Sequence, residues 1–336
     1  MAATALAGPN GTEPLQKPES DGFGASERLK RAAEAVKKLG KKYDIAKIGD
    51  RGIGKGMNFY SVEKEVALGR EMSQEVEAQA KLFTDPVVNE YINRLGQNLV
   101  RNLDAQVPFT IKIVDSDEVN AFALPGGFFY INTGLIMAAE SEAELAGVMA
   151  HEIAHVAARH ATKQATKREI WSIASIPLVF IGGPAGMAVQ NFVGLAVPLT
   201  FLKFGRNAER EADLLGLQYQ FAAGYDPNAM ISFLEKLQDK DKKKPNFIAR
   251  AFATHPMNDD RIKRSQKVLE ALPQHEEYLV TTSEFEEMKA RLALLQDNRM
   301  TAPTEGRPTL RKSTGSGSDQ NIGPATRTWP ELLGVK

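Results

Sequence analysis

The residues of this sequence best suited to chemistry are two histidines and a glutamate in the stretch 150–160, which reads Ala-His-Glu-Ile-Ala-His-Val-Ala-Ala-Arg-His. His151 and His155 are four residues apart, so on a helix their imidazoles project from one face and can share one Zn²⁺. Glu152 lies beside any water that such a metal holds, where a carboxylate acts as general base. With only five histidines in 336 residues, the full motif H-E-x-x-H is expected by chance in about one chain in a few hundred. The spacing predicts a site for one Zn²⁺ per chain.

A long helix is expected to carry this motif. Ser141 and Glu144 form a capping box, and a run of alanine, leucine, valine, methionine and isoleucine follows at helical spacing. We therefore expect one helix over Glu142–Lys167, with the histidines near its middle.

The rest of the chain predicts an α+β fold in which helices predominate over a small β-sheet. Short alternating runs predict three strands, at Phe109–Val114, Val119–Leu124 and Phe128–Asn132. Helical periodicity predicts helices at Ser61–Leu82, Asp85–Asn102, Asn207–Ala223, Asn228–Leu237, Arg261–Leu272 and Ser283–Gln296. Asp85 is the expected N-cap of the second of these helices, and a charged loop is expected at Asp239–Lys244.

Composition limits the possible partners and chemistry. The chain is 43% hydrophobic and 25% charged, as in ordinary globular proteins, and its formal net charge is zero. Zero net charge gives no global field that would attract nucleic acid, so nucleic acid is not expected as a partner. The chain has no cysteine, which excludes disulfides and thiolate zinc ligands. Ala5-Leu6-Ala7 has the form of a signal-peptidase site, and we interpret it as the stub of a secretory signal.

Compositional shifts predict four regions. Residues 1–25 are expected to be a disordered lead-in, 26–60 a basic helix and a glycine-rich linker, 61–300 the folded domain that carries the zinc motif, and 301–336 a disordered tail. Gly49–Gly56 matches the G-x-x-x-x-G-K of a phosphate-binding loop. Position 56 is glycine where Mg²⁺ binding needs Ser or Thr, and a basic helix precedes the motif instead of a strand, so we interpret Gly49–Gly56 as a flexible linker.

One segment of the predicted domain, residues 170–202, contains no charged residue. It is long enough to span a bilayer, but Pro177, Gly182-Gly183-Pro184, Gly186, Gly194 and Pro198 divide it into short pieces. Two interpretations stay open: a buried helical hairpin, or a hairpin that makes peripheral contact with a membrane or covers the site.

A catalytic zinc needs a third protein ligand. Glu209 and Asp213 are four residues apart on a predicted helix, so both point the same way. Glu209 can bind the metal while Asp213 accepts the outer N–H of a ligand histidine. A solvated acidic helix face explains the same spacing, and the residues alone leave both interpretations open.

Four motifs in order resemble the HtpX, BepA and CAAX prenyl protease family of metallopeptidases, family forty-eight. They are the zinc motif at 151–155, Glu209-Arg-Glu-Ala-Asp213, Asn120-Ala-Phe-Ala-Leu-Pro-Gly-Gly127, and Thr254-His255-Pro256 followed by Arg261-Ile262. The resemblance extends from about Ser61 to about Leu272. It departs from the membrane-embedded members, which have several transmembrane helices. It departs also from the BepA type, because no tetratricopeptide repeats follow.

This resemblance implies a gluzincin metalloprotease with Glu209 as third zinc ligand and Asp213 behind a ligand histidine. It implies that Asn120, Ala121, Phe122 and Ala123 form an edge strand along which an extended substrate lies. Backbone recognition of this kind suits unfolded or misassembled proteins. The chain is most similar to the soluble or peripheral extracytoplasmic bacterial branch, so a periplasmic location and a role in envelope protein quality control are expected.

The resemblance also draws His255 and Arg261 into the site. His255 either donates to the oxyanion of the tetrahedral intermediate, with Arg261 adding charge, or closes the zinc site as a fourth ligand. We favour the second role, a latch. The alternatives to a protease are a zinc-stabilised binding or holdase protein without catalysis, and a membrane-surface protein built on residues 170–202. An intact Glu152 argues against a purely structural zinc site, which needs no base.

Overall fold

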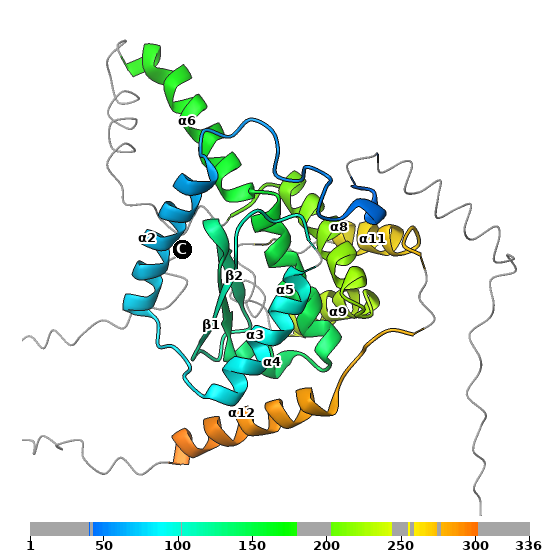
Figure 1. Ribbon diagram of the computed structural model, residues 1–336. Helices are drawn as coiled ribbons and strands as arrows, with labels where there is room; N and C mark the ends of the chain where they lie inside the picture. The colour runs from blue at the N-terminus through cyan, green and yellow to red at the C-terminus, as the bar shows by residue number, and fades with distance from the viewer. Residues whose placement is uncertain are drawn as a thin grey trace, which may run out of the picture.

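A computed structural model describes residues 40, 43–101, 103–179, 203–243, 255, 259–273 and 277–301 (Figure 1). The predicted lead-in, nearly all of the basic helix, residues 180–202 of the apolar segment and residues 302–336 lie outside the described residues. Within the described residues, no helix has both the length and the apolar character to cross a membrane.

The three predicted strands form one sheet in the order β1-β3-β2. β1 (Thr110–Val114) pairs in parallel with β3 (Phe128–Asn132), and β2 (Ala121–Leu124) pairs antiparallel with β3. β2 is therefore an edge strand, as expected. A tight 3-10 turn η3 (Pro125–Gly127) joins β2 to β3. Gly126 and Gly127 have φ of 75° and 91° there, which side chains with a Cβ rarely adopt.

Helices cover both faces of the sheet (Figure 1). One face, with Phe122, Leu124 and Tyr130, packs on α2 (Val62–Gln79). The other face, with Ile111, Phe129 and Ile131 among others, packs on α3 (Pro86–Val100) and α5 (Glu142–Ala157). Asp85 caps α3 as predicted, because its side chain accepts from the Val88 amide. Successive β2 residues point to opposite faces of the sheet, and helices cover both faces, so every β2 residue is buried.

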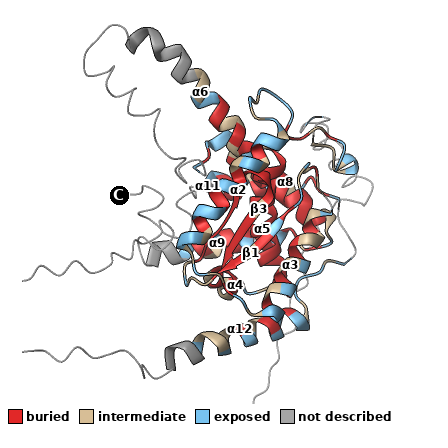
Figure 2. Ribbon diagram, turned by 60° about the vertical axis from the view of Figure 1, so that its left-hand side comes forward, coloured by how far each residue is buried: buried red, intermediate tan, exposed pale blue. Residues whose placement is uncertain are grey.

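α5 lies at the centre of the molecule, and every one of its residues is buried (Figure 2). Its other side packs on α8 (Arg206–Ala222) and α9 (Asn228–Lys243), and α11 (Asp259–Leu269) packs on these two. The backbones of α5 and α8 approach each other closely at Gly216, where an added Cβ would lie 3.0 Å from the His151 Cα. Because that distance leaves no room for a side chain, glycine allows α8 to lie directly against the motif helix.

The remaining elements border this core. They are η2 (Ile45–Lys47), α4 (Thr133–Ala138), α6 (His160–Val179) and α12 (Ser283–Thr301). α12 packs on α3 and α4 at one end of the molecule (Figure 1). α4 was not predicted. The charged loop expected at Asp239–Lys244 is wrong for residues 239–243, which continue α9, because aspartate and lysine in the absence of glycine and proline do not end a helix.

The single helix expected over Glu142–Lys167 is also wrong, because the chain breaks after Ala157. Arg159 has φ of 56°, a left-handed conformation that is unusual for a residue with a side chain. Its guanidinium bonds Glu65 and the Tyr60 carbonyl, and these contacts hold the break in place. α6 then starts in a new direction at His160.

The segment at 49–56, expected to be a flexible linker, is folded against the core instead. Ile53 is 2% exposed and belongs to the main hydrophobic cluster. Arg51 forms a buried ion pair with Asp104, with 2.6 Å between Nη2 and Oδ2. Asp104 also accepts from the Tyr219 hydroxyl on α8 at 2.8 Å. Sequence reasoning missed this role because it depends on a carboxylate more than 50 residues away.

Arg51→Ala is expected to destabilise the fold by about 3–5 kcal/mol, because it leaves the Asp104 carboxylate buried without its counter-ion. Denaturant unfolding measures the change. Lys55→Ala, an exposed residue in the same segment, is the matched control and should change stability by less than about 0.5 kcal/mol. Equal effects of the two substitutions would show that the ion pair does not anchor this segment.

Candidate metal centre

Four side chains bring donor atoms together at one buried point: His151, His155, Glu209 and His255. One donor atom from each lies within 4.8 Å of all the others. The Nε2 atoms of His151 and His155 are 3.2 Å apart, and His255 Nδ1 lies 3.4 Å from His151 Nε2 and 2.8 Å from Glu209 Oε1. All four residues are at most 4% exposed. The three ligands proposed from the sequence are therefore brought together, and His255 joins them.

Three elements position these donors. α5 presents both motif histidines on one face, as their spacing predicted, and the first turn of α8 supplies Glu209. The close approach at Gly216 holds the two helices together. His255 comes from the segment that precedes α11; Thr254 and Pro256 lie outside the described residues.

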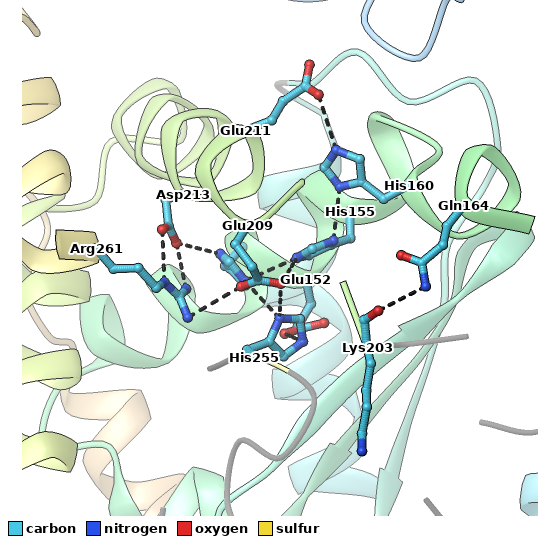
Figure 3. A network of polar contacts seen from close by, with 11 residues as sticks. Glu152, His155, His160, Gln164, Lys203, Glu209, Glu211, Asp213, His255 and Arg261 are labelled. Atoms are coloured by element: carbon cyan, nitrogen blue, oxygen red, sulfur yellow. Dashed lines mark hydrogen bonds and ion pairs between the residues drawn. The ribbon is translucent and has the colours of Figure 1, made fainter. Parts of the chain in front are cut away.

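The outer nitrogens of the two motif histidines have partners of their own. His151 Nδ1 lies 3.1 Å from Asp213 Oδ1, and His155 Nδ1 lies 3.0 Å from His160 Nδ1 (Figure 3). A neutral imidazole has one proton, and a carboxylate beside Nδ1 keeps that proton on Nδ1 of His151. If His155 is protonated at Nδ1 as well, two Nε2 lone pairs face each other at 3.2 Å. A cation between them removes that repulsion.

The spacing of the donors also suits a small tetrahedral ion. A metal about 2.0–2.1 Å from each nitrogen places ligand atoms about 3.3 Å apart. The distances from His155 Nε2 to His151 Nε2 and to Glu209 Oε1 are 3.2 and 3.5 Å. The residues present therefore fit a metal ion with three nitrogens and one carboxylate.

Burial and neighbouring charges set the protonation of the site. Burial, with the adjacent histidines, holds the pKa of His155 well below its ordinary value, so the ring is neutral and able to bind metal. Burial raises the pKa of Glu209, but His255 and His151 outweigh it and lower that pKa overall. Burial lowers the pKa of His255, but Glu152 and Glu209 outweigh it and raise that pKa to about 10 in the metal-free protein. A bound cation opposes this last shift, because it disfavours the imidazolium.

Glu152 lies beside the donor cluster, as the motif predicts. Its Oε1 is 3.2 Å from His255 Nε2, and the side chain is 2% exposed. One ring nitrogen of His255, Nε2, thus contacts the Glu152 carboxylate, which is expected to act as base. The other, Nδ1, contacts the donor cluster (Figure 3).

Arg261 lies in the site but is directed at its carboxylates. It donates to Asp213 through Nε at 3.0 Å and Nη2 at 2.7 Å, and its Nη1 lies 3.4 Å from Glu209 Oε2. Arg261 outweighs burial and holds the pKa of Asp213 far below its ordinary value. These contacts position the two carboxylates, and the role of Arg261 at an oxyanion stays a prediction. Asp213 in turn lies behind His151, as expected.

The edge strand runs past the metal ligands. Asn120 precedes β2, and Ala121, Phe122 and Ala123 lie within it, all at most 7% exposed. Ala123 and His155 line the same cavity of about 10 Å³. Phe204 packs on the Phe122 side of the sheet and stacks on His155, with ring centroids 4.0 Å apart. The centre is therefore closed in this conformation.

Sequence reasoning missed His160, Glu211, Tyr43 and Phe204. A histidine five residues after the second ligand was visible, but the assumed continuous helix would have directed it away from the metal. Glu211 lies two residues from Glu209, so helical spacing directs it away from the face that Glu209 and Asp213 share. Tyr43 and Phe204 carry no local signal, because their contacts are set by tertiary packing.

Curated relatives match between 53% and 64% of the chain. The beta-barrel assembly-enhancing protease of Escherichia coli (strain K12) is 32% identical over 224 residues, 63% of this chain and 45% of that protein. The protein of the same name from Yersinia pestis is 31% identical over 226 residues, 64% of this chain and 46% of that protein. The mitochondrial metalloendopeptidase OMA1 of Schizosaccharomyces pombe is 31% identical over 187 residues, 53% of this chain and 52% of that protein. The chain thus spans about half the length of these relatives.

The model of peptidase family M48 matches residues 86–268, which include every donor of the centre, the edge strand and Arg261. This range is more than half of the chain and contains all four motifs that resembled the family. The chain belongs to peptidase family M48.

Proposed function

We propose that this protein is a zinc-dependent endopeptidase whose general base is Glu152. The observation that supports it most directly is a carboxylate next to a buried four-donor cluster, on the same helix as two of the donors. His151, His155 and Glu209 would hold the zinc. Bound zinc supplies Lewis acidity and a water of lowered pKa at the peptide carbonyl. Glu152 takes the proton of the attacking water and returns it to the leaving amine.

Substrate is proposed to lie along β2, over Asn120–Ala123. β2 is the edge of the sheet, so its outer main-chain groups can pair with an extended peptide. Its neighbour on the motif side is His155, with which Ala123 shares a cavity. A peptide paired with β2 would thus reach the metal ligands. Pairing through the main chain favours unfolded segments of protein over any particular side chain.

The proposed setting is bacterial envelope protein quality control, in the periplasm and on misassembled proteins. Support comes from the name of the relatives, beta-barrel assembly-enhancing protease. The region 61–300 is proposed to act as one catalytic domain. Whether the apolar segment touches a membrane depends on residues 180–202, which lie outside the described residues.

His255 is proposed to act as a latch on the resting enzyme. Its Nδ1 lies among the donor atoms and its Nε2 contacts Glu152. His255 would therefore fill the fourth ligand position of the zinc and contact the general base at the same time. Such a resting state protects neighbouring proteins from cleavage. Substrate binding along β2 would have to displace both His255 and Phe204.

Glu152→Gln is expected to keep one zinc per chain but to abolish cleavage of casein, because an amide cannot accept the proton of the water. Zinc content and the rate of casein cleavage, with and without a chelator, are measured together. Glu140→Gln, an exposed neighbour that precedes α5, is the control and should leave both unchanged. Cleavage by zinc-loaded Glu152→Gln at the wild-type rate would remove Glu152 from the mechanism.

Glu209→Ala is expected to lower zinc content sharply, since one of the three permanent ligands is lost. Asp213→Ala removes only the partner of His151 Nδ1 and should cost about 10–100-fold in zinc affinity. Competition with a chelator measures both constants. A larger loss for Asp213→Ala than for Glu209→Ala would reverse the assigned roles.

His255→Ala is expected to raise the rate of casein cleavage about tenfold. This gain corresponds to a wild-type enzyme in which about a tenth of the molecules are in the open state, with His255 displaced from the site. Initial rates at equal zinc loading measure the change. Slower cleavage, with zinc still bound, would instead assign His255 to stabilisation of the oxyanion.

A further inference from the structure

His160 links the metal ligand His155 to α8 and to the N-terminal segment. It is 5% exposed, and its Nδ1 lies 3.0 Å from His155 Nδ1. Its Nε2 lies 3.2 Å from Glu211 Oε2, and Glu211 Oε1 accepts from the Tyr43 hydroxyl at 2.9 Å. In Figure 3 the His160 ring lies between His155 and Glu211.

The direction of each hydrogen bond in this chain follows from the carboxylate at its end. An ionised Glu211 only accepts, so the neutral His160 ring has its proton on Nε2 and a lone pair on Nδ1. The Nδ1 of His155 must then carry the proton and donate to His160. That assignment leaves the Nε2 lone pair of His155 directed at the donor cluster, 3.2 Å from His151 Nε2.

We propose that His160 is the positioning residue of the metal ligand His155, and that Glu211 and Tyr43 fix its own orientation. This inference rests on the proposed metal site. It gives the two motif histidines different supports: a carboxylate contacts His151 directly, whereas a second imidazole stands between His155 and its carboxylate.

The backbone break at Arg159 makes this arrangement possible. On a continuous helix, a residue five positions after His155 would be rotated about 140° away from it. The left-handed Arg159 instead turns the chain so that His160, the first residue of α6, faces back toward His155. Contacts of Arg159 with Glu65 and the Tyr60 carbonyl hold this turn.

The position of Glu211 on α8 explains why an intermediary is needed. Asp213 lies four residues after Glu209 and shares its face, next to His151. Glu211 is two residues from Glu209 and is rotated by about 200° from it, toward α6. From there its carboxylate contacts His160, which spans the distance to His155.

Zinc affinity of the full-length protein, measured by competition with a chelator, tests the proposal. His160→Leu removes the acceptor and is expected to weaken zinc binding about 10–100-fold. His160→Asn places a carbonyl oxygen near the former Nδ1 and should recover most of that loss. Gln164→Leu is the control: it lies one turn along α6, bonds the Lys203 carbonyl, and should leave affinity unchanged. Equal affinity of His160→Leu and wild type, or no recovery in His160→Asn relative to His160→Leu, would overturn the proposal.

The ring protons of the wild-type zinc protein give a test that needs no variant. Nitrogen-15 NMR is expected to find the proton of His155 on Nδ1 and that of His160 on Nε2. A proton on Nδ1 of His160 would overturn the proposal.

The outcomes also separate this inference from the proposed function. If His151→Ala and wild type take up zinc equally, the metal site itself is wrong; if only the His160 variants behave as wild type, the proposed function stands without it.

Discussion

The Nε2 atoms of His151 and His155 face each other at 3.2 Å in an interior where every contributing side chain is nearly fully buried. The surrounding structure has to stabilise this pair. Such a pair is stable with a cation between the rings and costly without one. The partners of the two Nδ1 atoms also favour a cation between the rings, because a proton fixed on Nδ1 leaves a lone pair on Nε2. His255 lies between two carboxylates, and Glu152 and Glu209 raise its pKa to about 10 against the effect of burial.

That requirement is met by the packing of α5 against α8. Three carboxylates of α8 serve the centre in different ways, Glu209 as a donor, Asp213 behind His151, and Glu211 behind His160. Their placement depends on the distance between the two helices, and Gly216 sets that distance at the level of His151. The buried Arg51–Asp104 pair supports α8 from its other side through Tyr219. The sheet is a smaller part of the fold, and its contribution is to place one edge beside His155.

Local periodicity was enough to predict the three strands, most helices and the common face of His151 and His155, whereas Glu209 was drawn into the donor cluster by the family resemblance. The i,i+4 spacing of His151 with His155, and of Glu209 with Asp213, is a property of one helix at a time, so it can be read without knowing the fold. The break at Arg159 could not be predicted, because an arginine takes a positive φ there only through contacts with Glu65 and Tyr60. The contacts of Arg51 and Arg261 could not be predicted for the same reason: each pairs with a carboxylate distant in sequence. Residues 180–202 stay a prediction with two interpretations.

The position of His255 connects the proposed latch with substrate binding. A residue that only filled the fourth position would need one nitrogen, yet both nitrogens of His255 are engaged, one with Glu209 and the other with Glu152. Phe204 closes the same region from the β2 side, stacking on His155 and lying 5.9 Å from His255 between ring centroids. Displacing His255 therefore loosens the packing beside the edge strand while it frees the base and the fourth position. Under the proposed mechanism, a peptide that pairs with β2 favours the open state by the free energy of that pairing, so that substrate binding itself activates the enzyme.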